Sequence, residues 1–421
     1  MRLWYFKIMK RNPYLFILLI ILVAILVFNR GKFIYLFFAP RQNIGQNGLD
    51  TKTNPIDTKD IEIVAQNLNI PWEIAFLPTG DMLVTERSGK LLKIGSVTKV
   101  MTSSPLLRAG FPTLTKDDIS GSIHPRAYAR GFLESVIKEI EGVKHIGEGG
   151  LLGLALHPDF AKNNFVHLYS TTQISGKISN RVERYKLVND VLSDRKVILE
   201  GIAGSVYHDG GRIAFGPDGY LYITTGDAES PNLAQDKYSL NGKILRIKDN
   251  GSIPPDNPFG NAVYSIGHRN PQGLAWDKNG ILWETEHGPS GSQTGYDEVN
   301  IISKGGNFGW PTVKGDQVKE GLISPIIQSG SKDTWAPSGM AYWDGSLFFS
   351  GLRGESLYEA KIKSGNKLEL VSHFKKEYGR LRAVVLGPDG FLYVTTSNRD
   401  GRGQVREGDD KIIKINPKIF R

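Results

Sequence analysis

The chain has 421 residues, of which 40% are hydrophobic and 23% charged, so a wholly disordered, collagen-like or polytopic membrane protein is excluded. It contains no cysteine, which excludes disulfides, thiolate metal sites and a cysteine nucleophile. The net charge of +9 does not indicate a nucleic-acid partner, because seven of the 52 basic residues and none of the 43 acidic ones lie in residues 1–41, and the remainder is nearly neutral.

Residues 14–28 form an apolar run without a charged residue, and Lys7, Lys10 and Arg11 precede it. Its 15 residues are fewer than the roughly 20 of a membrane span, but residues 34–39 add a second apolar patch. A cleaved signal peptide and an uncleaved anchor both fit. The lack of a small-x-small cleavage site favours an N-terminal transmembrane helix. In either case the positive-inside rule places the C-terminal part outside the cytoplasm, periplasmic or extracellular, and secreted if the segment is cleaved.

Three parts are therefore predicted: residues 1–40 as a cytoplasmic N-terminus with the membrane anchor, residues 41–60 as a polar linker, and residues 61–421 as the folded domain. Within the domain, apolar residues at 132, 133, 136, 137, 140 and 143 have helical spacing. This pattern predicts a helical insertion at about 104–146, as an excursion on a loop.

A turn centred on Gly or Asn-Gly, followed by an apolar strand, recurs along the domain. Its six copies are LPTGDMLVTER (77–87), HPDFAKNNFVHLYS (157–170), GPDGYLYITTGD (216–227), WDKNGILWETEHG (276–288), WDGSLFFSGLRG (343–354) and GPDGFLYVTTSN (387–398). The turn glycines Gly219, Gly280, Gly345 and Gly390 are 61, 65 and 45 residues apart, which suits four-stranded blades. An all-β, six-bladed β-propeller is predicted, with a β-sandwich as the rival fold.

Propellers place their sites where loops from several blades meet at the central channel, so polar residues at strand ends are the candidates. His208 opens the third repeat in HDGGR, and Asp227 closes the strand after its turn. A histidine is a natural general base, and a nearby carboxylate would fix its tautomer. A lone surface histidine beside turn glycines is the alternative.

Two further clusters offer anion and cation binding. Arg269 and Asn270 in GHRNPQG can bind an anionic ligand. The turn at Gly288 and Pro289 exposes carbonyl oxygens near the carboxylates of YDEVN, a donor set that suits calcium. A capped turn with solvated acids is the alternative.

Arg380 and Arg382 lie two apart in GRLRAVV, so in a strand they project to one face. Together with Arg269 and Arg353 they predict a ligand with several carboxylates or phosphates, unless the face is simply solvated. No P-loop and no dinucleotide fingerprint accompanies them. An anionic cofactor other than a nucleotide is favoured.

Ten motifs in order resemble the glucose/sorbosone dehydrogenase family, the soluble-type PQQ-dependent aldose sugar dehydrogenases. They are PWEIAFLPTGDMLVTER, EGGLLGLALHPDF, HDGGRIAFGPDG, GHRNPQGLAW, EHGP, DEVN, GGNFGWP, WAPSGM, LRG and GRLRAVVLGPDGFLYVTTSNRDGRG, spanning residues 61–418. The resemblance implies a six-bladed propeller that binds pyrroloquinoline quinone (PQQ) and calcium and oxidises the anomeric hydroxyl of aldoses to lactones.

The resemblance also implies residue roles. His208 matches the family's general base, Asp227 the acid beside it, Glu148 a residue facing the sugar, and Arg269 a group beside the cofactor carbonyl. The remaining implied positions are cofactor contacts at Asn270, His287, Thr334, Trp335, Arg353, Arg380 and Arg382, cofactor calcium at the backbone oxygens of Gly288 and Pro289, and a separate structural calcium at Glu298. His287 stands where some members have glutamine, and Ala383 where many have an acid, which affects substrate choice.

The predicted protein is thus a membrane-tethered, extracytoplasmic PQQ-dependent dehydrogenase of a small-molecule sugar, passing electrons to a quinone or another acceptor. Two alternatives stay open at this stage. One is a non-catalytic extracellular propeller that binds a glycan or a protein. The other is a calcium-dependent lactonase, which would need carboxylates converging on a channel metal, whereas arginines predominate here.

Overall fold

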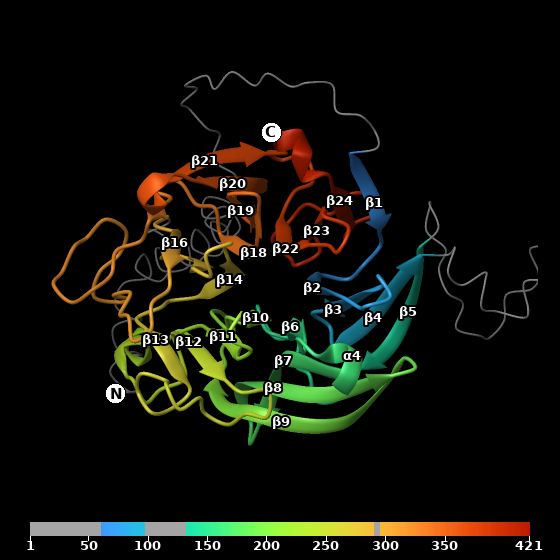
Figure 1. Cartoon of the computed structure of the whole chain (residues 1–421), viewed down its shortest axis with the longest axis horizontal. Coiled ribbons are helices and arrows are strands. Elements are labelled where there is room, and N and C mark those ends of the chain that lie inside the picture. Colours follow the sequence, from blue (N-terminus) through green and yellow to red (C-terminus); the bar gives the residue numbers. More distant parts are fainter. Residues whose placement is uncertain (1–59, 97–131, 290–294) are drawn as a thin grey trace, which may run out of the picture. The chain divides into compact units, whose positions relative to one another are not determined.

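A computed structural model of the chain describes residues 60–96, 132–289 and 295–421. They form six four-stranded antiparallel sheets, arranged as blades around a centre (Figure 1). The blades, each from its inner strand outward, are β2 (Pro71–Phe76), β3 (Met82–Glu86), β4 (Lys90–Ser96), β5 (Phe132–Glu139); β6 (Leu151–Leu156), β7 (Phe165–Ile174), β8 (Lys177–Val188), β9 (Val191–Ala203); β10 (Ile213–Phe215), β11 (Leu221–Thr225), β12 (Lys243–Ile247), β13 (Val263–Ile266); β14 (Pro271–Trp276), β15 (Leu282–Glu286), β16 (Glu298–Ile301), β17 (Ile327–Gln328); β18 (Pro337–Trp343), β19 (Ser346–Gly351), β20 (Ser356–Ile362), β21 (Leu368–His373); and β22 (Leu381–Leu386), β23 (Leu392–Thr396), β24 (Ile412–Ile415), β1 (Ile61–Ala65).

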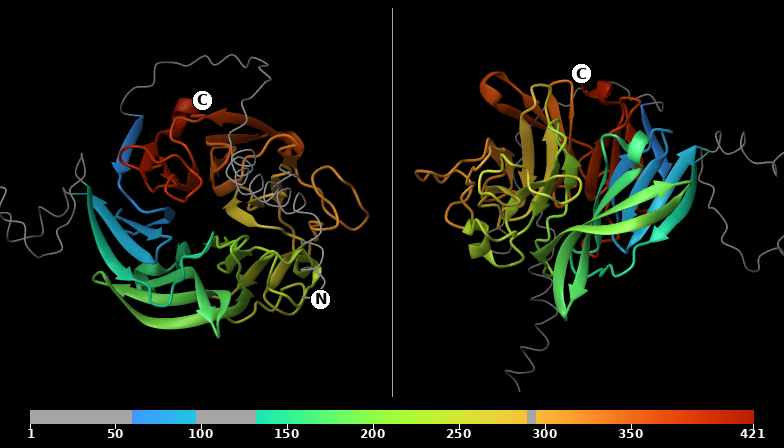
Figure 2. Two further views of the ribbon diagram at one scale, coloured as in Figure 1. Left: turned by 180° about the vertical axis from the view of Figure 1, so that it is seen from behind. Right: turned by 60° about the horizontal axis from the view of Figure 1, so that its bottom comes forward.

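The predicted six-bladed β-propeller is confirmed. The last blade takes its outer strand from the start of the domain, because β1 pairs antiparallel with β24. Figure 2 shows these first and last strands, blue and red, side by side from behind. This pairing joins the two ends of the ring without a covalent link. Helical structure among the described residues is limited to α4 (Phe160–Asn163), η2 (Pro231–Gln235), η4 (Ser364–Asn366) and η5 (Pro417–Phe420).

The repeated turn has the same geometry wherever its Gly-x-x-Gly or Asp-x-x-Gly form occurs. The backbone N–H of Gly219, Gly280 and Gly390 each donates to the carbonyl three residues earlier. These glycines have φ of 77°, 77° and 79°, a left-handed conformation that disfavours any side chain. In these three blades the turn therefore fixes where the inner strand ends and where the second strand begins.

Apolar residues of neighbouring blades pack face to face. One cluster joins Leu152 and Tyr169 of the second blade to Ile213, Ile223 and Leu245 of the third, all nearly or fully buried. The inner strands contact one another around the ring. Because this core lies between blades, the strand ends and loops near the centre are left to carry polar groups.

The helix predicted within residues 129–143 is wrong: residues 132–139 form β5, which pairs antiparallel with β4. A short apolar run fits both a helical and a strand pattern. The β-branched Val136 and Ile137 favour a strand, and the free edge of β4 supplies the backbone partners that decide it. Residues 104–131 of the predicted insertion lie outside the described residues.

The predicted membrane anchor and most of the linker, residues 1–59, also lie outside the described residues. Within 60–96, 132–289 and 295–421, no helix has the length and apolar character needed to cross a membrane.

Candidate active site

A pocket lies at the centre of the ring, and its wall comes from inner strands and from loops at the strand ends. Its lining residues are Trp72, Glu148, Asp209, Gly210, Gln272, His287, Leu352, Arg382 and Arg402. Three of these, Glu148, His287 and Arg382, were predicted from the sequence as site residues. The pocket therefore brings three of the predicted site residues together.

His208 and Asp227, predicted as base and acid partner, are in direct contact. The imidazole Nδ1 lies 2.7 Å from Asp227 Oδ1, and Asp227 is fully buried. Because an ionised carboxylate only accepts, Nδ1 carries the proton in this pair, and Nε2 is left as an acceptor. The second oxygen of Asp227 accepts from Trp310 Nε1 at 2.8 Å. The carboxylate is thus held on both sides and fixes the imidazole.

The backbone around this pair is tightly packed. His208 has φ +64°, an unusual conformation for a residue with a side chain, and its N–H donates to Glu148 Oε2 at 3.0 Å. A Cβ on Gly226 would collide with the carbonyl oxygen of His208. Only glycine therefore fits before Asp227, and this close approach sets the distance between base and carboxylate.

Glu148 stands beside the base. Burial opposes its ionisation, but the charge of Arg402 and the N–H of His208 outweigh burial and lower the pKa of Glu148 to about 2. Arg402 NH1 lies 2.7 Å from Glu148 Oε1. The prediction of Glu148 as a sugar-facing residue stays a prediction, now with a charged carboxylate in the pocket wall.

Arg269, Arg380 and Arg382 are buried, each 6% exposed. Arg380 is bidentate to Asp400, with nitrogens 2.9 and 2.8 Å from Oδ2. The guanidinium of Arg269 lies over the Trp310 ring, 5.4 Å from its centroid. By contrast Arg353 is exposed, so the structure does not bring it into this buried group, and its cofactor contact remains a prediction.

Two buried arginines, Arg382 in the pocket wall and the nearby Arg87, have no ion-paired carboxylate among the described residues. Arg380 and Arg402 are ion-paired, whereas in the part of the chain that the structure describes no carboxylate is ion-paired with Arg87 or Arg382. Burial and the nearby Arg87 lower the pKa of Arg382 to about 9. Buried unpaired guanidinium groups are costly, so the pocket fits an anionic ligand that brings its own carboxylates.

Asn270 and His287 complete the polar wall. Asn270 is fully buried, and its Oδ1 accepts from Gly210 N–H at 3.1 Å, while its Nδ2 has no partner among the described residues. Burial lowers the pKa of His287 to about 4, so it is neutral at pH 7, and its Nε2 donates to the Pro337 carbonyl at 2.8 Å. The unpaired Nδ2 of Asn270 can donate a hydrogen bond to an oxygen atom of a ligand, and the neutral His287 adds no charge to this part of the wall.

Thr334 and Trp335 serve mainly to hold a buried carboxylate. Asp297 Oδ2 accepts from Thr334 Oγ1 and from the N–H groups of Trp335 and Ala336, at 2.7, 2.7 and 2.9 Å. The Trp335 ring packs in the core against Phe349 and Tyr358. Their contact with a cofactor remains a prediction.

The described residues do not by themselves complete the predicted calcium sites. Asp297 Oδ1 accepts from the N–H of Gly288 at 2.9 Å, so this carboxylate is already occupied by donors. A calcium ion at the carbonyls of Gly288 and Pro289 would therefore need oxygens from the bound ligand. Glu298 is buried, and from the described residues it accepts two long hydrogen bonds, 3.4 Å from Asn300 Nδ2 and 3.3 Å from Gly315 N–H. Its structural calcium stays a prediction.

Sequence reasoning missed Trp72, Asp209, Gln272 and Arg402 of the pocket, and Arg87 close to Arg382. The Trp72 ring lies close to two guanidinium groups, with Arg212 at 4.2 Å and Arg382 at 5.7 Å from its ring centroid. Arg87 and Arg402 both stood in quoted motifs, after TE in the first repeat and in NRDGRG after the last. Their position directly after a repeat strand was the available signal.

Asp209 is a buried acid in the pocket wall with a raised pKa. Burial raises the pKa of this carboxyl to about 7 from 3.8, against hydrogen bonds from Asn180 and Ser205 that lower it. Its Oδ2 has no partner among the described residues. Between pH 3.8 and 7 the folded protein keeps a proton that the unfolded chain has lost, so stability falls as pH rises through this window.

We therefore expect Asp209→Asn to increase the free energy of unfolding at pH 8, by up to about 4 kcal/mol, and to leave it almost unchanged at pH 4. Denaturant unfolding at both pH values measures the difference, and the exposed Asp194→Asn is the matched control. A parallel pH dependence of wild type and Asp209→Asn would contradict the raised pKa.

Comparison with known proteins identifies a family and several relatives of this chain. The family model for Glucose / Sorbosone dehydrogenase matches residues 114–407. Aldose sugar dehydrogenase YliI of Escherichia coli is 31% identical, over 86% of this chain and 94% of that protein. Quinoprotein glucose dehydrogenase B of Acinetobacter calcoaceticus is 32% identical over 61% of this chain and 53% of its own length. The PQQ-bound aldose sugar dehydrogenase of Streptomyces coelicolor superposes with a TM-score of 0.70 at 38% identity, covering 84% and 97% of the two chains.

The family match spans more than half of the chain, and the Streptomyces structure shares its fold over most of its own length. The ordered motifs, the six blades and the matched length therefore agree: the chain belongs to the glucose/sorbosone dehydrogenase family.

Proposed function

We propose that this protein oxidises the anomeric hydroxyl of an aldose to the lactone, with PQQ as its cofactor. The observation that carries the proposal is a fixed histidine base, His208, bonded through its backbone to Glu148 of the pocket wall, which also contains the buried Arg382. Arg382 and the nearby Arg87 fit an anionic ligand with several carboxylates, and His208, whose Nδ1 is bound to Asp227, has Nε2 available. A propeller that only binds a glycan would have no need of a base oriented by a buried carboxylate.

Bound PQQ would supply the oxidant, taking up two electrons from the substrate as a hydride equivalent. His208 Nε2 would accept the proton of the anomeric hydroxyl, and Asp227 would stabilise the resulting imidazolium through Nδ1–H. Arg87 and Arg382 would bind cofactor carboxylates, and Arg269 would offset negative charge developing at the reacting end. Glu148, ionised and held by Arg402, would accept hydrogen bonds from the sugar hydroxyls.

The test is reconstitution of the full-length chain. We expect PQQ, added with calcium, to be bound with a change in its absorbance spectrum and to give aldose-dependent reduction of an artificial electron acceptor. One lactone should form for every two electrons that the acceptor takes up. PQQ binding without turnover on a panel of aldoses would contradict the substrate class, and the absence of any spectral change would favour the binding-propeller alternative.

A further inference from the structure

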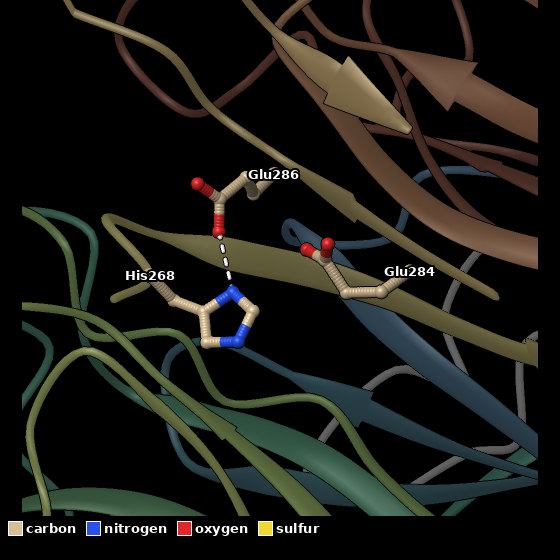
Figure 3. Close-up of side chains that lie close together, drawn as sticks. All are labelled: His268, Glu284 and Glu286. Atoms are coloured by element: carbon tan, nitrogen blue, oxygen red, sulfur yellow. Dashed lines mark hydrogen bonds and ion pairs between the residues drawn. The ribbon is translucent and has the colours of Figure 1, made fainter. Parts of the chain in front are cut away.

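A second polar cluster lies inside the fourth blade, behind the pocket wall. It consists of His268, Glu284 and Glu286, which we call the His268 cluster (Figure 3). All three residues are buried, with exposed fractions of 0%, 0% and 4%. One ligand atom from each lies within 4.8 Å of the other two. Neither the predicted chemistry nor the proposed calcium ions use this cluster.

The strand geometry explains why acids gather here. Glu284 and Glu286 are two residues apart in β15, so their side chains leave the same face of the sheet. The paired residues of β16 are Asn300 and Glu298, respectively, so this face carries only polar side chains at four neighbouring positions. His268 reaches it from the loop before β14, as Figure 3 shows.

The hydrogen bonds of the cluster leave one carboxylate oxygen without a donor. His268 Nδ1 lies 3.0 Å from Glu286 Oε2, and its Nε2 lies 2.8 Å from Ser265 Oγ. Glu284 Oε2 accepts from Asn300 Nδ2 at 3.0 Å. Glu284 Oε1 and Asn300 Oδ1 have no partner among the described residues. A buried oxygen without a donor is costly, and two such oxygens on one face indicate a missing positive group.

The charges around the His268 cluster also indicate that a positive group is missing. Glu284 and Glu286 are both buried, and in the described part of the chain neither carboxylate is ion-paired with a lysine or arginine. The nearby Lys243 ammonium is already used, because it donates to the carbonyls of Leu233, Ala234 and Asn241. The two carboxylates must therefore be neutralised by protons or by a cation that enters the cluster.

We propose that the His268 cluster binds a divalent transition-metal ion, Zn²⁺ or Mn²⁺, through His268 Nδ1 and the carboxylates of Glu284 and Glu286. One imidazole with two carboxylates suits these ions, whereas Ca²⁺ and Mg²⁺ prefer oxygen ligands alone. Two carboxylates also balance the charge of a divalent ion.

The surroundings are suited to such a site. Ser265 Oγ can accept from Nε2–H, which leaves Nδ1 directed at the ion, the usual outer-shell arrangement for a metal-bound histidine. The Phe308 ring stacks on the imidazole, with centroids 4.7 Å apart. Atoms that each lie about 2.1 Å from one ion are at most about 4.2 Å apart, so the side chains must close slightly, which rotation of a glutamate side chain allows.

The bound ion would influence the pocket through the neighbouring residues Arg269 and His287. His268 directly precedes Arg269, and Glu286 Oε1 accepts from the Arg269 N–H at 3.4 Å. Glu286 also directly precedes His287, which lines the pocket. Binding of the ion would therefore fix the strand ends that carry Arg269 and His287. The site is structural and distinct from the predicted calcium ions, which use only oxygen donors.

The experiment measures metal content and thermal stability of the full-length chain after chelator treatment and dialysis against Zn²⁺ or Mn²⁺. We expect close to one tightly bound ion per chain that excess Ca²⁺ does not displace, and a Tm that rises with the ion. Glu284→Gln, nearly equal in volume, should weaken binding by at least about 100-fold and remove the rise in Tm. Its metal-free Tm should equal or exceed that of the metal-free wild type.

His373→Gln is the matched control, because His373 also contacts a buried glutamate, with Nε2 3.1 Å from Glu359 Oε2. It should bind the ion like the wild type. The proposal is overturned if the wild type takes up no stoichiometric ion and its Tm does not respond, which would mean that protons alone neutralise the cluster. It is equally overturned if Glu284→Gln binds as the wild type does. The wild-type measurements stand even if a variant fails to fold.

Discussion

Replacing His208 with glutamine is expected to lower kcat by about 10²–10⁴-fold, the usual contribution of a positioned general base. The Nδ1 of His208 is committed to Asp227 at 2.7 Å, so Nε2 is the atom left to accept a proton. Glutamine can keep a hydrogen bond to Asp227 but has no basic nitrogen. Initial rates at saturating aldose, with PQQ bound, measure the loss.

Binding and folding should be nearly unaffected by this change, because His208 is not among the groups that carry the positive charge of the pocket. The absorbance titration with PQQ should therefore give the wild-type affinity, and Tm should be similar. His157→Gln, which changes a histidine of the second blade away from the pocket, serves as the control. An unchanged kcat in His208→Gln would remove this residue from the mechanism.

The fold could be predicted because its signal is local and repeated. Five of the six copies have a turn glycine with positive φ and a strand after it, as at Gly219 and Gly390, and the second copy has Asn164 with φ 56° instead; six copies give six blades. The pairing of β1 with β24 could not be read in the same way, because it joins Ile61 to Ile415 across the whole domain. The spacing in residues 132–143 matched a helix by chance, since nothing local reveals the free edge of β4.

In the candidate site too, contacts within one repeat could be predicted from the sequence, whereas contacts between distant repeats could not. His208 and Asp227 flank the hairpin of β10 and β11, so an antiparallel turn alone brings them to the same end of the blade. The contact of Glu148 with Arg402 links residues 254 apart, and no pattern within one repeat predicts it. The alternation of side chains along a strand predicted that Arg380 and Arg382 lie on one face. It could not show that Arg380 is ion-paired with Asp400, whereas Arg382 has no such partner among the described residues.

That difference between the two arginines gives the second large expected effect. Arg382→Met should weaken PQQ binding by about 10²–10⁴-fold, since losing one partner of a buried charged pair costs about 3–5 kcal/mol. At the same time it should raise the Tm of the cofactor-free protein. Burial lowers the pKa of Arg382 to about 9 from 12.5, so at pH 7 the folded protein holds a guanidinium that the pocket disfavours, and methionine removes this cost while keeping much of the side-chain volume.

Arg380→Met is the matched comparison, and its effect on the cofactor-free protein should have the opposite sign. Arg380 holds Asp400 through two nitrogens and donates to the Leu352 carbonyl at 3.1 Å, so its removal leaves a buried carboxylate unpaired and should lower Tm. Thermal unfolding of both variants without PQQ, followed by titration with PQQ, separates the two roles. If Arg382→Met lowers Tm as much as Arg380→Met does, Arg382 is part of the propeller's own packing, and the pocket has no uncompensated charge for an anionic cofactor to neutralise.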